Sequence, residues 1–477
     1  MNIRRRCCVM GALLLLSACN SGPNFKTPDA PKVDAYISKE DAIPLQDRIA
    51  LGKRIETEWW TLFASDALDK LVKQAVENNY DLVAARETLA QAEEAVNARN
   101  GGLSPQVSLG AAAGRQKYGV ALFGPSNFSI PPFSYYEAGP SVSWMPDIFG
   151  GEHRAVERQK ALANYQAHQL DAIYVAITGN TVSAALDMAS ANAEIAAVQK
   201  IIAEDNKTLD LVQDSYDAGA ATKLDVLNAQ NKLDSDQALL APIEQRLSVS
   251  RHLLSILVAN APANWTSTNF DLANFNLPQA LPVSLPSELV KKRPDILAAE
   301  ANLHAASASI GVATADLYPQ LTLTADMMQE ALTPAGIFKA TNNAWSIAAG
   351  LTAPIFNGGT LSAQKREAEH AYQAALAQYQ QTILVAFKQV ADALTSIAHD
   401  DAELAALNKA LDTASSLSEL SHISYQEGAI GLIQVQDAER SEAEAQLRII
   451  RVQHQRYLDC VRLFVALGGS PVSTQKS

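Results

Sequence analysis

The chain contains two copies of one sequence pattern, and this internal duplication constrains its fold more than any other feature. The stretch YDAGAATKLDVLNAQ at 216–230 is repeated as YQEGAIGLIQVQDAE at 425–439, 209 residues later (425 − 216). SPQVSLGAAAG at 104–114 is repeated as YPQLTLTADMM at 318–328, 214 residues later (318 − 104). Repeats at a nearly fixed distance mark duplicated structural units. The fold must therefore contain two equivalent halves.

The two halves share one predicted order of elements. YDLVAARETLAQAEEAV recurs as PDILAAEANLHAASASI, with Asp81 and Asp295 214 residues apart (295 − 81). DIFGGEHRAVERQKA recurs as PIFNGGTLSAQKREA, with Phe149 and Phe356 207 residues apart (356 − 149). Each half is predicted to contain a helix, a strand, a loop, a second strand, a long helix, a Tyr-x-x-Gly turn and a final helix.

Two segments in each half alternate between apolar and polar residues. In 320–328 and 345–355 every second residue is apolar or alanine, and the first half repeats this around 107–113 and 142–144. Period two is typical of strands with one apolar face. Runs of about 9–11 residues match membrane-spanning strands, and Trp144 and Trp345 fit an aromatic girdle at the membrane surface.

Alternation alone fits equally well a soluble hairpin whose apolar face covers a core. Two features favour the membrane: no stretch of 18 apolar residues exists outside the N-terminus, and the N-terminus itself directs the chain to a membrane. Four strands cannot close a barrel, and open edges in lipid leave backbone groups unsatisfied, at several kcal/mol each. Spanning strands would therefore require a barrel shared between chains. The loops ALFGPSNFSIPPF and LTPAGIFKATNN are rich in turn-forming residues and suit exposed tips.

The long segments between strands and turns predict long helices. Residues 151–215 contain no proline and one glycine, Gly179, so a continuous helix would reach about 95 Å. In the C-terminal part of this segment apolar residues recur every 3.5 residues on average, as in coiled coils. Asp205 is the one polar residue at such a position. The apolar positions are Ala184, Met188, Ala191, Ile195, Val198, Ile202, Leu209, Val212 and Tyr216, echoed by Ile397, Leu404, Leu407, Leu411 and Ala414 in 360–425. A cytosolic helical hairpin bundle is the alternative, and the export signal disfavours it.

The N-terminus reads as a processed signal. Basic residues 4–6 precede an apolar run at 9–16, and Leu16-Ser17-Ala18-Cys19 is similar to a bacterial lipobox, in which Cys19 becomes the acylated first residue. Cleavage near Ala18 as an ordinary signal peptide is the alternative. Asn20 after the cysteine favours the outer membrane in that pattern. Only Cys460 would remain as a thiol, which excludes an intramolecular disulfide.

Composition excludes several function classes. The net charge is −13 and no basic patch exists, so nucleic acid is not an expected partner. The sequence contains no phosphate-binding glycine loop, His-Glu-x-x-His motif, paired-cysteine motif or nucleophile elbow. The eight histidines are scattered singly. We therefore expect no enzyme, and no catalytic, cofactor-binding or metal site.

Four segments resemble a known family: WWTLFASDALDKLVKQAVENNYDLVAA at 59–85, LPSELVKKRPDILAAEANL at 285–303, IFNGG at 355–359 and SYQEGAIGLIQVQDAERS at 424–441. They are similar to the outer-membrane factor lipoproteins of tripartite RND-type efflux systems, the TolC-like proteins of the NodT type. The resemblance covers roughly residues 19–469 and occurs in both halves.

The resemblance implies a fold that is mainly α with a transmembrane β part. Each protomer of a homotrimer would give four strands to a 12-stranded outer-membrane barrel and long helices to a periplasmic α-barrel. A small equatorial domain would be built from 34–64, 259–286 and the C-terminal tail. The implied function is a passive exit duct for small molecules that works with a periplasmic adaptor (membrane fusion) protein and an inner-membrane RND-type pump. Alternatives are the outer-membrane channel of type I protein secretion, or a periplasmic adaptor or coiled-coil scaffold.

The repeated turns are the candidate gate. Gly219 and Gly428 fit left-handed helix C-caps, and by resemblance the turns that follow Tyr216 and Tyr425 would form the periplasmic entrance. Counted from each tyrosine, position ten is Asp225 or Gln434, and position thirteen is Asn228 or Asp437.

The resemblance also implies roles for the acidic residues of these turns. Asp437 would give three converging carboxylates at the aperture, and Asp225 would hold the closed state with Tyr425 nearby. The family sometimes has an arginine where this chain has Ile430, so we expect a hydrophobic or hydrogen-bonded closure instead of an ion pair. The alternative for both aspartates is an ordinary solvated surface position.

The remaining expectations concern boundaries. Arg293-Pro294-Asp295 is interpreted as a helix cap, because proline in a first turn loses no hydrogen bond and aspartate there favours the helix dipole. We expect a signal peptide at 1–18, a lipidated and equatorial segment at 19–65, a first repeat at 66–260, an equatorial linker at 261–286, a second repeat at 287–468 and a tail at 469–477.

Overall fold

The computed structural model describes residues 21–29, 31, 33, 35–38, 49–53, 55–117, 131–266, 268–277 and 280–469. The predicted signal segment and Cys19 lie outside these residues, as do most of the first predicted loop and nearly all of the tail. The chain divides into two compact units. One comprises Met1–Pro28, Leu89–Gln166 and Ala299–Tyr379, and the other Asp29–Thr88, Ala167–Ala298 and Gln380–Ser477.

The bounds of the helices confirm the duplication. Helices α3 (Tyr80–Gly101) and α8 (Pro294–Ala315) have 22 residues each. The long helices α4 (Gly151–Asp217) and α9 (Thr360–Gln426) have 67 residues each and begin 209 residues apart (360 − 151). The long-helix prediction is therefore confirmed in both halves.

The final helix differs between the copies. The second copy has one helix, α10 (Leu432–Ala466), whereas the first has α5 (Lys223–Gln237) and α6 (Leu240–Leu257). Pro242 lies just after this break. Proline lacks the N–H that would bond to the carbonyl four residues earlier, and its ring clashes with that carbonyl. The expected single helix was therefore wrong for the first copy.

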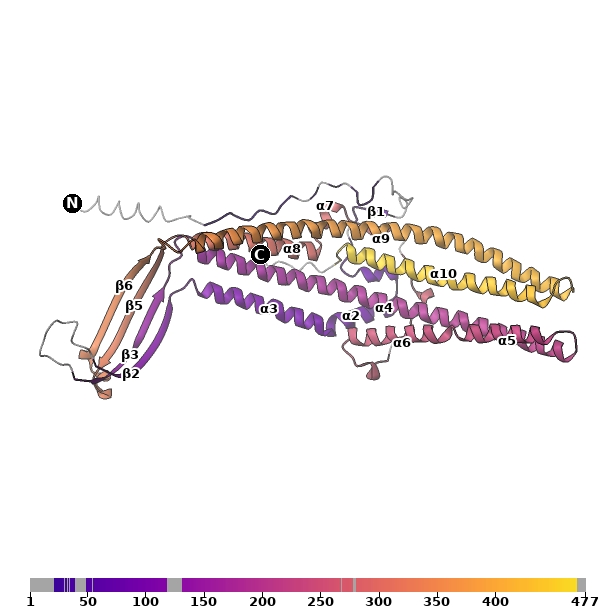
Figure 1. Cartoon of the computed structure of the whole chain (residues 1–477), viewed down its shortest axis with the longest axis horizontal. Coiled ribbons are helices and arrows are strands. Elements are labelled where there is room, and N and C mark those ends of the chain that lie inside the picture. The colour runs from indigo at the N-terminus through magenta and orange to yellow at the C-terminus, as the bar shows by residue number, and fades with distance from the viewer. Residues whose placement is uncertain are drawn as a thin grey trace. The chain divides into compact units, whose positions relative to one another are not determined.

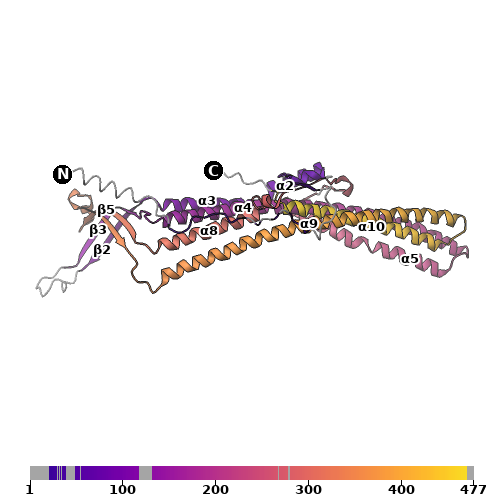
Figure 2. The same ribbon diagram turned by 90° about the horizontal axis from the view of Figure 1, so that it is seen from above.

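The first unit contains a four-stranded antiparallel sheet in the order β2-β3-β5-β6, visible as four adjacent arrows in Figures 1 and 2. The strands are β2 (Gln106–Gln116), β3 (Phe133–Trp144), β5 (Gln320–Ala331) and β6 (Asn343–Thr352). The two hairpins have one register, because Gln106 pairs with Ser143 at the start of β2 and Gln320 pairs with Thr352 at the start of β5.

Cross-strand rows show that the sheet has one apolar and one polar face. One row runs through Val107, Val142, Ala325 and Ile347. The adjacent row runs through Ser108, Ser141, Asp326 and Ser346. The hydroxyls of Ser108 and Ser141 lie 2.7 Å apart, and Ser346 donates to Asp326 at 3.2 Å. The alternation predicted for these strands is confirmed.

The apolar face is exposed in the single chain. Leu109 is 83% exposed and Ile347 is 77% exposed. A soluble hairpin would bury these side chains against a core, as the hydrophobic effect demands. A contiguous apolar patch of this kind marks an interaction surface. The soluble-hairpin alternative does not describe this sheet.

An N-terminal strap, residues 21–27, is fixed to the helices of the first unit. Ser21 donates through its backbone N–H and its hydroxyl to the carbonyl of Phe149, at 3.1 and 2.6 Å. Arg154 donates to the carbonyl of Ser21 and to Asn24. Gly22 has φ of 79°, and a Cβ there would lie 2.5 Å from the Cα of Gly311. The strap therefore packs backbone against backbone.

The second unit has an aromatic core. The 3-10 helix η1 (Trp59–Phe63) supplies Trp59, Trp60 and Phe63, all buried, and Trp59 and Phe63 pack on Phe464 of α10. Helix α2 (Asp66–Asn78) is capped by Ser65. The short strands β1 (Ile49–Leu51) and β4 (Leu281–Val283) pair in parallel, which joins the two predicted equatorial segments.

Arg293 has a larger role than the predicted cap. Its guanidinium is buried and makes a two-point ion pair with Asp295, at 2.8 and 2.9 Å. It also donates to the carbonyl of Ala466 at the end of α10, at 2.9 Å, and to Gln389 of α9. Asp295 in turn accepts from the N–H of Ile296. The cap is therefore part of a junction between α8, α9 and α10.

No helix in the described ranges is long and apolar enough to cross a membrane.

Candidate functional site

The two repeated turns have the same backbone conformation. Gly219 has φ of 77° and Gly428 has φ of 72°. Each glycine donates its backbone N–H to the backbone carbonyl of the tyrosine three residues earlier, Tyr216 or Tyr425, at 2.9 Å. A Cβ would meet nothing within 4 Å at either glycine, so the left-handed conformation alone requires glycine here. Both turns lie at the same end of the second unit (Figures 1 and 2).

The helices that follow these turns are capped differently. In the first copy the Thr222 hydroxyl accepts a hydrogen bond from the backbone N–H of Asp225. The Asp225 carboxylate in turn accepts two hydrogen bonds from Thr222, one from its backbone N–H at 2.8 Å and one from its hydroxyl at 2.7 Å. This reciprocal pair is a capping box. The hydrogen bonds from Thr222 lower the pKa of Asp225. In the second copy Gly431 takes the cap position without a side-chain hydrogen bond, and Gln434 replaces the aspartate.

The other predicted gate residues lie on the surface of the turns. Asp437 and Gln434 are exposed on α10, and Val435 and Ala438 between and beside them are buried. Tyr216 and Tyr425 are exposed to a similar degree. The ammonium of Lys223 lies 5.8 Å from the ring centre of Tyr216, within the range of a cation–π contact. The hydrogen bonds of Asp225 go to Thr222, so this single chain brings Asp225 to a cap and not to Tyr425.

Leu432, which sequence reasoning did not single out, joins the two turns. It is the first residue of α10 and packs on Val212 of α4 and on Val226 and Ala229 of α5. Leu209 completes this cluster. A small apolar contact therefore holds the two helical hairpins together near their tips.

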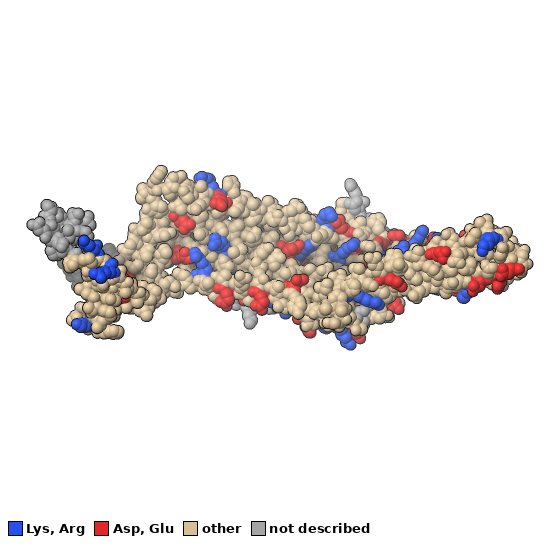
Figure 3. Space-filling model, turned by 60° about the horizontal axis from the view of Figure 1, so that its bottom comes forward, with Lys and Arg blue, Asp and Glu red and all other residues tan. Residues whose placement is uncertain are grey.

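On the face seen in Figure 3, several acidic side chains lie along one edge of the hairpin end, and acidic and basic side chains are interspersed along the helices.

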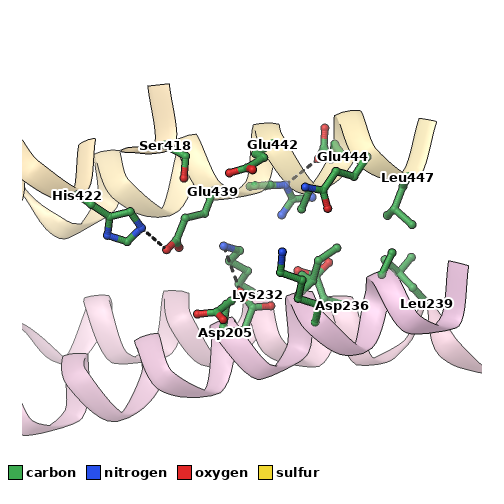
Figure 4. A pocket seen from close by; sticks show the side chains of 17 residues that line it. Asp205, Lys232, Asp236, Leu239, Ser418, His422, Glu439, Glu442, Glu444 and Leu447 are labelled. Carbon is green, nitrogen blue, oxygen red and sulfur yellow. Dashed lines mark hydrogen bonds and ion pairs between the residues drawn. The ribbon is translucent and has the colours of Figure 1, made fainter. Parts of the chain in front are cut away.

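A cavity of about 290 Å³ lies between the α4–α5 and α9–α10 hairpins. Figure 4 shows charged side chains of both hairpins around it. Lys232 lies 3.1 Å from Asp205, and on the facing hairpin His422 lies 3.0 Å from Glu439. Arg440 pairs with Glu444 at 2.9 Å. Each of these ion pairs stays within its own hairpin.

Asp236 is the electrostatically strained member of this cavity. Burial and the neighbouring Asp205 carboxylate raise its pKa to about 6, whereas Arg440 and Lys232 oppose the rise. Asp205 and Asp236 are both buried. Two close carboxylates cannot both ionise without cost, so Asp236 keeps its proton up to about pH 6. The interruption of the predicted apolar spacing by Asp205 was the one sequence signal of this cluster.

Three further carboxylates of the second unit, those of Asp400, Asp459 and Glu194, carried no sequence signal. Burial and the adjacent Asp459 raise the pKa of Asp400 to about 7, and Asp459 is itself held by Arg462 at 2.6 Å. Glu194 of α4 accepts from Arg246 of α6 and Arg451 of α10. These groups tie helices together and do not line the turns.

No group of histidine, cysteine, aspartate and glutamate in the described segments has the arrangement of a metal site.

Comparison with known proteins identifies the arrangement. The family described as "Outer membrane efflux protein" matches residues 71–258 and 285–469, one segment in each half. The pyoverdine export outer membrane protein OpmQ of Pseudomonas putida is 30% identical over 481 residues, covering 98% of each chain. The probable outer membrane lipoprotein SilC of Salmonella typhimurium is 26% identical, covering 96% of this chain and 97% of its own. The outer-membrane channel OprN has the same fold, with a TM-score of 0.86 and 27% identity over 95% of this chain and 99% of its own.

Proposed function

The chain belongs to the outer membrane efflux protein family, and from that premise we propose that it is the outer-membrane exit duct of a tripartite efflux system. It is a channel component of the outer membrane, and its relatives are channel and efflux proteins. The duct conducts small molecules passively, so the energy for transport comes from partner proteins.

The observation that carries the proposal is the four-stranded sheet. Its apolar face is exposed, its polar face carries serine and aspartate, and β2 and β6 each pair on one side only within the described strands. Unpaired strand edges cost several kcal/mol per backbone group in lipid. Three copies of the chain supply twelve strands, which close the sheet with the polar face toward a water-filled interior. This accounting supports a homotrimer.

The same symmetry gives roles to the turns. Three chains place six turns around one entrance, which supports the proposal that Asp437 lines the aperture as a ring of three carboxylates. Asp225 and Tyr425 remain the proposed closure residues, with Gln434 and Tyr216 beside them. The capping box supports an indirect part for Asp225 in this closure: its carboxylate stiffens the first turn. The apolar contact of Leu432 then holds the two hairpins of each chain together.

The N-terminal strap supports membrane anchoring through acylated Cys19. Ser21, two residues later in the sequence, is bonded to Phe149 in the segment between β3 and α4. We retain the repeat and linker boundaries given above as part of the proposal.

The proposed partners are a periplasmic adaptor protein at the turns and an inner-membrane RND-type pump. OpmQ, by its name, exports pyoverdine, and we propose that this chain likewise exports a small molecule. No observation favours a duct for protein secretion, and a scaffold without a pore would not need an exposed apolar sheet.

Native trimers and conductance test this function. The protein should be extracted from outer membranes in mild detergent and run on denaturing gels with and without heating, and the same preparation should be added to planar bilayers. We expect a trimer band that becomes a monomer band on heating, and discrete conductance steps. A monomer on both gels with no conductance would overturn the proposal.

A further inference from the structure

The cavity between the two hairpins has the properties of a ligand site. It lies between α4–α5 and α9–α10 and has a volume of about 290 Å³. We propose that it binds an organic amine, whose ammonium group lies between Asp205 and Asp236 and whose apolar body lies between Leu239 and Leu447. The residues proposed for the aperture are not part of its described lining, and the inference holds whether or not the chain is an exit duct.

The walls of the cavity carry an excess of negative charge. The lining contains three lysine or arginine side chains and six carboxylates. The carboxylates are those of Glu204, Asp205, Asp236, Glu439, Glu442 and Glu444. Glu204 pairs with Lys207, which is not part of the lining, and Glu442 accepts a hydrogen bond from Ser415. The excess favours a positively charged occupant.

The two most buried carboxylates of this set lack a hydrogen-bond donor. Asp205 is 5% exposed, and its Oδ1 pairs with Lys232 at 3.1 Å. Its Oδ2 is buried and has no hydrogen-bond partner among the described residues. The carboxyl group of Asp236, which is 8% exposed, lies within hydrogen-bonding range of Asp205 and can donate to it only while it carries a proton. A donor is therefore missing at this place once Asp236 ionises.

The cations that act on Asp236 are engaged elsewhere. Both Lys232 and Arg440 lower the pKa of Asp236, but burial and Asp205 outweigh them. Lys232 pairs with Asp205, and Arg440 of the facing hairpin pairs with Glu444 at 2.9 Å. The other basic groups of the lining are the imidazole of His422, which pairs with Glu439, and the exposed ammonium of Lys200. The positive charge between the two aspartates is therefore left to an occupant.

An ammonium group fits this place better than a metal ion. In the described part of the chain no group of three or more histidine, cysteine, aspartate or glutamate side chains is arranged to hold a metal. An ammonium has three N–H donors, and two of them suffice for Oδ2 of Asp205 and one oxygen of Asp236. A positive charge between two close carboxylates also removes the cost of ionising both.

The part of the cavity beside Asp236 is apolar. Figure 4 shows Asp236 between Asp205 and Leu239 along the first hairpin. Leu239 and Leu447 point toward each other from the two walls in the same view. Leu239 is 40% exposed, so an apolar group placed there covers surface that is otherwise in contact with water. The expected occupant is therefore an amine with an alkyl or aromatic body.

The site lies at the joint of the first hairpin. Asp236 is in the last turn of α5, and Leu239 directly precedes α6. An amine that contacts both of these residues and Leu447 of α10 connects the two hairpins across the joint. We therefore expect bound amine to slow hydrogen exchange of the backbone amides at 238–241.

Calorimetric titration of the full-length protein in detergent tests the site, with n-hexylamine as the probe. Binding should saturate at one amine per chain, and n-hexanol and hexanoate should not bind measurably. Because Asp236 loses its proton on binding, the affinity should rise about tenfold between about pH 5 and about pH 7 and then level off.

Three variants separate the parts of the site. D236N should abolish the rise of affinity with pH and weaken binding at neutral pH by about tenfold or more. D234N, which neutralises an exposed carboxylate on the same helix, is the matched control and should bind like the unmodified protein. L239A should weaken the binding of hexylamine more than that of ethylamine, because only the longer chain reaches Leu239. The thermal midpoint of each variant shows that it is folded.

Each alternative gives a different result. Equal affinities of D236N and D234N, an affinity that does not change with pH, or binding of hexanol as tight as that of hexylamine would overturn the amine site. Displacement of hexylamine by an equal concentration of calcium ions would show a metal site instead. None of these measurements uses conductance or trimer migration, so their failure leaves the exit duct untouched.

Discussion

The carboxylate of Glu194 on α4 accepts a 2.8 Å hydrogen bond from Arg246 on α6, although the Glu194 side chain is only 1% exposed. Arg451 of α10 approaches the other carboxylate oxygen at 3.2 Å. Both arginines remain half-exposed. One buried anion therefore holds together helices of the first and second repeats.

Removing the two arginines together should destabilise the protein more than neutralising the glutamate. R246A/R451A leaves a buried carboxylate with only a 3.4 Å hydrogen bond from Ser190 and no counter-charge, at about 3–5 kcal/mol. E194Q keeps a hydrogen-bonding group and frees two arginines that water can solvate, at about 1–3 kcal/mol. Thermal unfolding in detergent measures both. K388A, which breaks an exposed ion pair with Asp392, is the control and should change the thermal midpoint very little. Equal effects of E194Q and the double variant would contradict this interpretation.

The capping difference predicts unequal stability of the two turns. T222A removes the capping box and should raise the pKa of Asp225 toward its ordinary value and destabilise the start of α5 by about 0.5–2 kcal/mol. Hydrogen exchange of the amides near 222–226 should accelerate. T222S keeps the hydroxyl and serves as control. The converse variant, G431T/Q434D, builds the capping box in the second copy and should slow hydrogen exchange there. If exchange is unchanged in both T222A and G431T/Q434D, the capping box does not cause a difference in stability between the turns.

Truncating Leu432 should loosen the hairpins at the entrance. L432A removes the α10 side chain from the cluster with Val212 and Val226, and a partly buried leucine contributes about 1–2 kcal/mol. We expect longer or more frequent open periods of single channels. L420A, at an exposed site on α9, is the matched control. If the two variants gate alike, the cluster does not hold the closed state.

Neutralising Asp437 should reduce the preference of the channel for cations. D437N removes three charges from the proposed ring, and fixed charges at a narrow opening act on ions most strongly at low salt. Reversal potentials in a salt gradient across a planar bilayer measure the change. D392N, a remote exposed site on α9, is the control. Unchanged selectivity in D437N would place Asp437 outside the aperture.

The stability of the second unit should depend on pH through Asp236. The pKa of Asp236 in the folded protein, about 6, lies above its ordinary value of 3.8. Its stabilising contribution is therefore complete below about pH 3.8 and is lost as the pH rises through about 6. The thermal midpoint should fall as the pH rises from about 4 to about 6, and D236N should reduce that fall. Asp400, with a pKa of about 7, contributes to the same pH dependence, so D236N/D400N should flatten the plot of thermal midpoint against pH further.

D234N, at an exposed position on the same helix, controls for the loss of one charge. A midpoint of D236N that falls with pH as steeply as that of the unmodified protein would show that Asp236 is ionised throughout.

The local and repeated features could be predicted from sequence. The absence of proline from 151–215 determined α4, and strict alternation determined the strands and their faces. The break before α6 was also accessible, since Pro242 is written in the sequence, and so was the Thr222-x-x-Asp225 capping box. Asp205 signalled the polar cavity by interrupting the apolar spacing.

The long-range contacts could not be predicted in this way. Glu194 and Arg451 are 257 residues apart, and no periodicity connects them. Arg293 reaches Ala466 across 173 residues, so the local motif showed only its cap. Leu432 looked like one more apolar residue of a turn, because its role depends on how two hairpins pack.

The interruption between α5 and α6 gives the two hairpins of one chain different mechanical stiffness. Helix α10 is a continuous rod of 35 residues, and a displacement at its first residue is transmitted along its axis. The first hairpin has a joint at Ala238 and Leu239, where α5 can bend without bending α6. We therefore expect a load applied at the turns to bend the first hairpin more readily than the second.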